Sequence, residues 1–99
     1  MNLDDEIRSL REKTNNSRRQ FLEASLETCF IAIERAHLEL SVGNTHEAQK
    51  EFLVARRGAD VAERFLREAP VQMAHIEAKL ADLRSALKSL GAELGTATF

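Results

Sequence analysis

The sequence has very few of the residues that interrupt helices or build disulfides. Its 99 residues include one Pro, four Gly and one Cys, and neither Trp nor Tyr occurs. A β-rich domain of this size would need more turn residues and more β-branched and aromatic residues. Cys29 alone cannot form an intrachain disulfide, and its place in an apolar pattern is typical of a buried thiol. These absences favour one helical domain.

No part of the chain forms a long block of one charge or a long apolar run. Charged residues make up 30% of the sequence, the formal net charge is −2 and the pI is about 5.9. This balance argues against a nucleic-acid-binding arm and a polybasic membrane anchor. No run approaches the ~18 apolar residues of a membrane span, and residues 1–13 are too charged for a signal peptide. We therefore expect a cytoplasmic protein with no nucleic-acid and no membrane partner.

An unbroken apolar seam runs through the second half of the sequence. Its members recur at alternating spacings of four and three, the heptad pattern of packed helices. They are Ala48, Phe52, Ala55, Ala59, Ala62, Leu66, Ala69, Met73, Ile76, Leu80, Leu83, Leu87, Leu90 and Leu94. The seam is rich in Ala before Pro70 and rich in Leu after it. It predicts long helices that pack side by side.

Turn and cap residues divide the chain into three main helices, at about residues 17–42, 45–69 and 71–94. Gly43 suits the position after a helix end, where positive φ is common. Asn44 suits an N-cap, and Glu47 three residues later completes a capping-box spacing. The short turn makes the first two helices antiparallel neighbours.

The N-terminal boundary rests on a run of residues that favour caps and turns. Thr14, Asn15, Asn16 and Ser17 interrupt the helical pattern, and Ser17 with Gln20 has capping-box spacing. Residues 3–13 can form a short helix before this interruption. The predicted organisation is an N-terminal segment (1–16), a helical domain (17–94) and a flexible tail (95–99).

Pro70 leaves two all-α architectures open. Proline is favoured in the first turn of a helix but costs about 3 kcal/mol in its interior. If the chain reverses at Pro70, the three helices of matched length form an antiparallel three-helix bundle. If Pro70 only kinks one long helix, the chain forms a long two-helix hairpin that dimerises as a coiled coil. We favour the bundle because each of the first two helices carries two apolar stripes.

The apolar stripes supply the candidate interaction surfaces. The first main helix has one stripe from Leu22 to Leu40 and a second that reads Phe21, Ala24, Thr28, Ile31, Arg35, Leu38 and Val42. In the second helix, Gly58 costs about 1 kcal/mol relative to Ala and is either tolerated or marks a close helix crossing. We expect the exposed apolar surface in the Leu-rich part of the seam, with the N-terminal segment second. The interface candidates are Leu83, Leu87, Leu90, Leu94, Ile7 and Leu10.

One pair of residues has the spacing of a metal-binding motif. Glu34 and His37 form a Glu-x-x-His sequence, as in carboxylate-bridged di-metal bundles. Such sites need two of these pairs and two further Glu residues, whereas this chain has one pair. The simpler and favoured interpretation is a boundary Glu and a boundary His beside the apolar stripe of this helix. The sequence has no phosphate loop, no Cys/His metal spacing and no nucleophile motif, so we expect no catalytic residue, no cofactor and no enzymatic activity.

One helical hairpin resembles a single tetratricopeptide repeat. Gly43, Ala48, Phe52 and Ala55 have the spacing of the small and aromatic positions around that repeat's turn, and Ala36 fits a small position of its first helix. The likeness covers residues 32–60 and departs where Ala32, Arg35, Glu39 and Asp60 replace the usual aromatic, Leu and Pro residues. It implies a similar hairpin, and it carries no site residues over.

The predicted function is that of a protein–protein interaction or assembly module acting through apolar helix faces. The expected partner is another protein or a second copy of the chain in a homodimer. The alternative is a helical-bundle metal-binding protein or enzyme built around Glu34 and His37.

Overall fold

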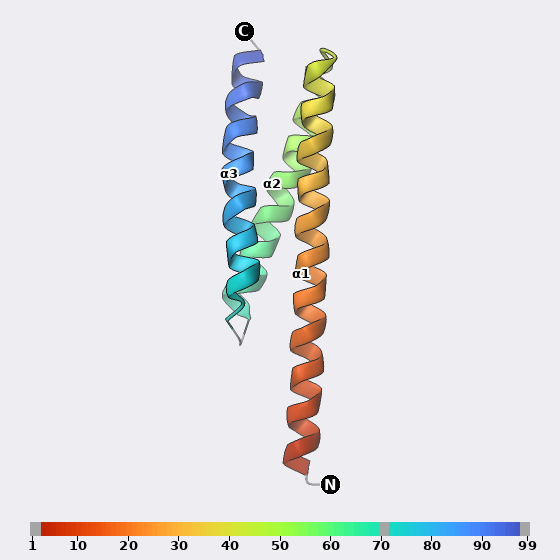
Figure 1. Ribbon diagram of the computed structural model, residues 1–99, viewed down its shortest axis with the longest axis vertical. Coiled ribbons are helices and arrows are strands. Elements are labelled where there is room, and N and C mark those ends of the chain that lie inside the picture. The colour runs from red at the N-terminus through yellow and green to blue at the C-terminus, as the bar shows by residue number, and fades with distance from the viewer. Residues whose placement is uncertain (1–2, 70–71, 98–99) are drawn as a thin grey trace.

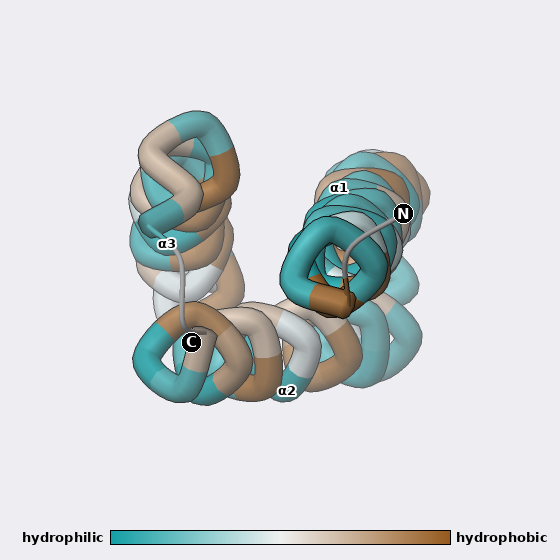
Figure 2. Tube along the Cα trace, turned by 90° about the horizontal axis from the view of Figure 1, so that it is seen from below, coloured by the Kyte–Doolittle hydropathy of each residue, from teal (hydrophilic) through white to brown (hydrophobic). Residues whose placement is uncertain are grey.

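A computed structural model describes residues 3–69 and 72–97 of the chain. In these residues three helices follow one another: α1 (Leu3–Ser41), α2 (Thr45–Glu68) and α3 (Ala74–Ala97). All three pairs of helices are in contact, and the molecule measures 65 × 17 × 16 Å. Seen end-on, α2 lies across one side of the pair formed by α1 and α3 (Figure 2). The fold is the expected all-α, three-helix bundle.

The first helix is much longer than predicted. α1 is continuous for 39 residues, which corresponds to about 58 Å at 1.5 Å per residue. The predicted interruption at Thr14–Ser17 and the helix start at Ser17 are therefore wrong. Instead of capping a new helix, the Thr14 hydroxyl donates a 2.9 Å hydrogen bond back to the carbonyl of Leu10, so the polar side chain is satisfied within the helix.

The turn between α1 and α2 has the predicted conformation at Gly43. Its φ is +84°, and its N–H donates to the Leu40 carbonyl at 3.1 Å. The N–H of Asn44 donates to the Glu39 carbonyl at 2.8 Å, which completes a Schellman motif. Asn44 occupies the N-cap position, but the capping box with Glu47 is wrong. The Asn44 side chain makes no capping bond and donates to the Glu39 carboxylate at 2.8 Å.

The second and third helices are separate and lie side by side (Figure 1). The long-hairpin alternative, in which they form one kinked helix, is therefore wrong. Ala69 has extended backbone, as expected for a residue before proline, while Pro70 and Val71 lie outside the described residues. α3 begins at Ala74 and continues past the predicted end at Leu94, so residues 95–97 of the predicted tail are helical.

The heptad seam of α2 and α3 forms most of the core. Eleven of its fourteen members are buried, and Phe52, Leu66 and Ala69 pack against them as partly buried residues. The core is completed from α1 by Leu22, Leu26, Cys29, Ala32, Ile33 and Ala36. Beside the Ala-rich half of the seam, α1 and α2 approach closely: a Cβ built at Gly58 would overlap the sulfur of Cys29. Gly58 therefore marks a close crossing of α1 and α2.

Candidate interaction surface

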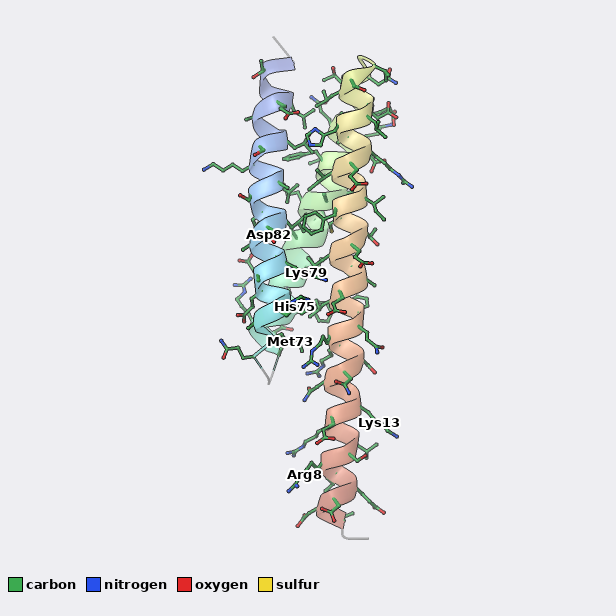
Figure 3. All side chains as sticks on the ribbon, in the orientation of Figure 1. Arg8, Lys13, Met73, His75, Lys79 and Asp82 are labelled. Carbon is green, nitrogen blue, oxygen red and sulfur yellow. The ribbon has the colours of Figure 1, made fainter. Side chains whose placement is uncertain are left out.

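The two ends of α1 have different surroundings. Residues 18–41 lie beside α2 and α3, whereas residues 3–17, called the arm below, extend beyond the other two helices (Figure 1). All described arm residues are exposed except Asn15, which is intermediate. Figure 3 shows Arg8 and Lys13 projecting from the arm with no other helix beside them. Among the described residues, neither α2 nor α3 covers the arm.

One side of α1 carries an inner stripe that faces the bundle. Its members are Leu22, Leu26, Cys29, Ile33, Ala36 and Leu40, all buried except the partly buried Leu40. Toward the arm, the same alternating spacing gives Arg19, Asn15, Glu12, Arg8 and Asp5. The inner stripe thus becomes polar where α2 and α3 end. This change fits an arm whose inner side remains in water.

A second, outer stripe runs along the far side of α1 over its whole length. Because α1 is continuous, the apolar residues of the arm join those of the bundle at unbroken spacings of four and three. The outer stripe comprises Leu3, Ile7, Leu10, Thr14, Ser17, Phe21, Ala24, Thr28, Ile31, Arg35, Leu38 and Val42. All twelve are exposed. Twelve positions in heptad register, all uncovered, form a ready surface for another helix.

The outer stripe is bordered by apolar residues of α2. Phe21 packs against Phe65 with ring centroids 5.6 Å apart, and Gly58 lies against Cys29. Val54 and Val61, one helical turn on either side of Gly58, are exposed. The edge of α2 that follows α1 therefore widens the apolar surface. Beside Phe65, a small pocket at the base of the arm is lined by Arg18, Glu68 and Ala69.

The predicted interface residues fall into two groups. Ile7 and Leu10 belong to the outer stripe and are exposed. Leu83, Leu87, Leu90 and Leu94 are at most 6% exposed and form part of the core. The expectation that the Leu-rich part of the seam is an exposed surface is therefore wrong for the single chain. These leucines belong to one buried cluster with the inner stripe of α1 and the Ala-rich face of α2.

The metal-site candidates Glu34 and His37 are not brought together with further ligands. Nδ1 of His37 lies 3.3 Å from the Glu93 carboxylate of α3, and both side chains are about half exposed. Among the described residues, no group of three or more His, Cys, Asp or Glu side chains is arranged to hold a metal ion. The His37–Glu93 pair instead links α1 to α3.

Cys29 has the environment of a structural thiol. It is 4% exposed, and burial raises the pKa of its thiol through desolvation. Because the thiolate is the nucleophilic form, this shift lowers the reactivity of the sulfur at neutral pH. The predicted burial of Cys29 is confirmed.

Sequence reasoning missed the outer stripe as a single feature. The expected interruption at Thr14–Ser17 divided it into an arm stripe and a helix stripe. The missed signal was the spacing itself, since Thr14 and Ser17 occupy the two positions that connect Leu10 to Phe21. Thr and Ser have lower helix propensities than Ala or Leu, but a helix that is already nucleated can continue through them.

No family model, curated protein or solved structure matches the chain. The likeness of residues 32–60 to a tetratricopeptide repeat accordingly stays a prediction. Within the described part of the chain, none of the helices has the length and apolarity needed to cross a membrane.

Proposed function

We propose that the protein is an assembly module that docks a helix along the outer stripe of α1. The observation that carries this proposal is the exposure of all twelve heptad positions of that stripe. A surface helix normally keeps one apolar face, which it buries, and a polar face in water. α1 has two apolar faces, and the three-helix bundle covers only the inner one.

The size of the outer stripe supports a stable docking surface. Its seven large apolar side chains are 40–71% exposed. At roughly 100–150 Å² for each fully exposed side chain, they offer on the order of 400–600 Å² of apolar area. One side of a standard protein interface buries about 800 Å². The apolar stripe therefore supplies the central part of such an interface, and its polar flanks supply the remainder.

The arm gives a second reason to expect docking. Isolated helices of about 15 residues are marginal in water even with good helix-forming sequences. The arm contains Thr14, Asn15, Asn16 and Ser17, whose helix propensities are low. A docked helix would stabilise it by covering Leu3, Ile7 and Leu10.

The test combines sedimentation velocity with amide hydrogen exchange of residues 3–17. We expect the full chain to sediment as a particle heavier than 11.1 kDa, with protected arm amides. An Ile7→Glu variant places a charge on the stripe and should release the arm, so both signals should fall. Ser9→Glu, a matched control on the inner side of the arm, should change neither.

A single-chain mass at high protein concentration, together with arm amides that exchange as in an unfolded peptide, would overturn the proposal. In that result the outer stripe would be a solvated face. Equal effects of Ile7→Glu and Ser9→Glu would also count against it, because docking would then not depend on the stripe.

A further inference from the structure

We infer that the helix docked on the outer stripe is α1 of a second copy, running antiparallel to the first. This inference rests on the proposed function and names its partner and geometry. The two copies would form a symmetric dimer. In it, the arm of each copy lies along residues 28–42 of the other copy, called the bundle half of α1 below. Three observations carry it: the distribution of large apolar residues, the distribution of charge and the position of the apolar edge of α2.

The outer stripe is apolar at its two ends and small or polar at its centre. Leu3, Ile7 and Leu10 lie at one end, and Ile31, Leu38 and Val42 lie at the other. Full antiparallel overlap makes the residue numbers of facing positions add to 45. Leu3 then faces Val42, Ile7 faces Leu38, and Phe21 faces Ala24 near the centre. This register gives Leu3, Ile7, Leu38 and Val42 apolar partners. It sets Leu10 against the aliphatic stem of Arg35, and Ile31 against the small side chain of Thr14.

Charge favours the antiparallel direction over the parallel one. From Arg8 to Arg19 the helix carries five cations and Glu12, a net charge of +4. From Glu23 to Glu39 it carries four carboxylates and Arg35, a net charge of −3. Antiparallel pairing brings the basic segment of each copy against the acidic segment of the other. Parallel pairing sets like charges against each other along the whole helix, which opposes association.

Two charged residues beside the outer stripe illustrate the charge complementarity of the antiparallel pair. Lys13 and Glu34 occupy equivalent heptad positions beside the stripe, and in the antiparallel register they lie within two residues of each other, about 3 Å along the helix axis. Among the described residues, neither side chain takes part in an ion pair within its own chain. Arg35, the one charged member of the stripe, faces Leu10 and lies within a helical turn of Glu6 of the other copy. In a parallel dimer Arg35 would face itself.

The exposed edge of α2 lies where an antiparallel arm would run. α2 passes beside the bundle half of α1, with Gly58 level with Cys29 and Phe65 level with Phe21. The arm of a second copy, lying along residues 28–42, would therefore also pass Val54, and the part of that copy's α1 just after the arm would pass Val61. In a parallel dimer the arms meet only each other beyond the bundles, and this apolar edge stays uncovered.

Cysteine cross-linking tests the direction of the pair. Ile7→Cys protein is mixed with Leu38→Cys protein and oxidised mildly, and peptide mapping identifies the joined residues. The antiparallel dimer predicts a 7–38 link in the mixture and little linking of Ile7→Cys protein alone. The unmodified chain, whose Cys29 is buried, is the control and should remain unlinked.

Charge exchange gives an independent measurement. Lys13→Glu and Glu34→Lys should each weaken self-association by about tenfold, because each dimer contains two copies of the pair. A mixture of the two variants should associate better than either alone. Glu77→Lys, an exposed position on α3, is a control with the same change of charge and should have no effect.

The outcomes separate this inference from the proposed function. A 7–7 link in Ile7→Cys protein alone would show a parallel pair and overturn the antiparallel inference, while docking on the outer stripe would stand. A dimer that forms no link at either position would overturn the inference in the same way. Absence of any association, with an unprotected arm, would overturn the proposed function itself.

Discussion

Replacing Gly58 with alanine tests the closest crossing in the bundle. An exposed helical Gly→Ala change stabilises a helix by about 0.8–1 kcal/mol. At Gly58, however, the new Cβ would overlap the sulfur of Cys29, which is itself 4% exposed and held in the core. Overpacking of this kind costs typically about 1–3 kcal/mol. We expect Gly58→Ala to lower the free energy of unfolding by about 1 kcal/mol.

A second variant, Cys29→Ala, removes the sulfur atom that the new Cβ would overlap. In a Cys29→Ala background the space occupied by the sulfur is free, and a methyl group at position 58 can fill part of it. The same Gly58→Ala change should then be neutral or stabilising by up to about 1 kcal/mol. The coupling energy between the two positions is therefore about 1–2 kcal/mol and favours the double variant.

Urea unfolding followed by far-ultraviolet circular dichroism measures all four proteins of this cycle. Protein concentration must be equal in each, since self-association would contribute to stability. For a domain of this size, 1 kcal/mol corresponds to about 4–8 °C in Tm, so thermal unfolding checks the same values. If Gly58→Ala stabilises the protein with Cys29 intact, or if the two changes are additive, the close approach of α1 and α2 at this point is refuted.

Three further predictions address the core, the turn and the thiol. Leu83→Ala, at a fully buried position, should cost about 2–5 kcal/mol in urea unfolding, whereas Leu38→Ala on the exposed outer stripe should change the stability of the single chain by less than about 0.5 kcal/mol. Gly43→Ala should lower the free energy of unfolding by about 1–2 kcal/mol because φ is +84° there, while Gly95→Ala, where an added Cβ meets nothing within 4 Å, should raise it by up to about 1 kcal/mol. Cys29 should react slowly with a thiol reagent in the native protein, because burial raises its pKa. Since the unfolded thiol ionises near pH 8.5, the free energy of unfolding should be unaffected by Cys29 below that pH and should fall as pH rises through the higher folded pKa.

Each of these predictions has a result that would contradict it. Equal costs for the two leucine variants would mean that the core is not where the structure places it. A neutral Gly43→Ala variant would argue against positive φ at the turn. Rapid native labelling of Cys29, or unchanged high-pH stability loss in Cys29→Ala, would argue against a buried thiol.

Much of the architecture follows from local chemistry that the sequence displays directly. The seam from Ala48 to Leu94 identifies the buried face of two helices because heptad spacing keeps those residues on one side. Gly43 identifies the turn because positive φ is unfavourable for other residues. The extended backbone of Ala69 follows from its place before a proline.

The candidate surface was harder to predict because local chemistry allows two structures at the residues that decide it. Thr14 and Ser17 have side chains that can either cap a helix or bond within it, and the two choices have similar free energies. A predicted N-cap at Ser17 divides α1 into two helices, and the outer stripe is then not recognised as one surface. The leucines after Pro70 were expected on the surface. Heptad spacing identifies an apolar helix face, but it does not show whether that face packs within the chain or against a partner.

The sequence by itself determined that this protein is helical, where two of its helices bury their seam and where the chain turns after Val42. These features depend on periodicity and backbone preferences, which act over a few residues. Only the tertiary structure decided that α1 is one helix, that Leu83 and its neighbours are buried in one cluster with the inner stripe, and that the outer stripe remains exposed. Those outcomes depend on which apolar faces meet. Each of the first two helices carries two apolar stripes and the third carries one, and packing decides which of them remain exposed for a partner.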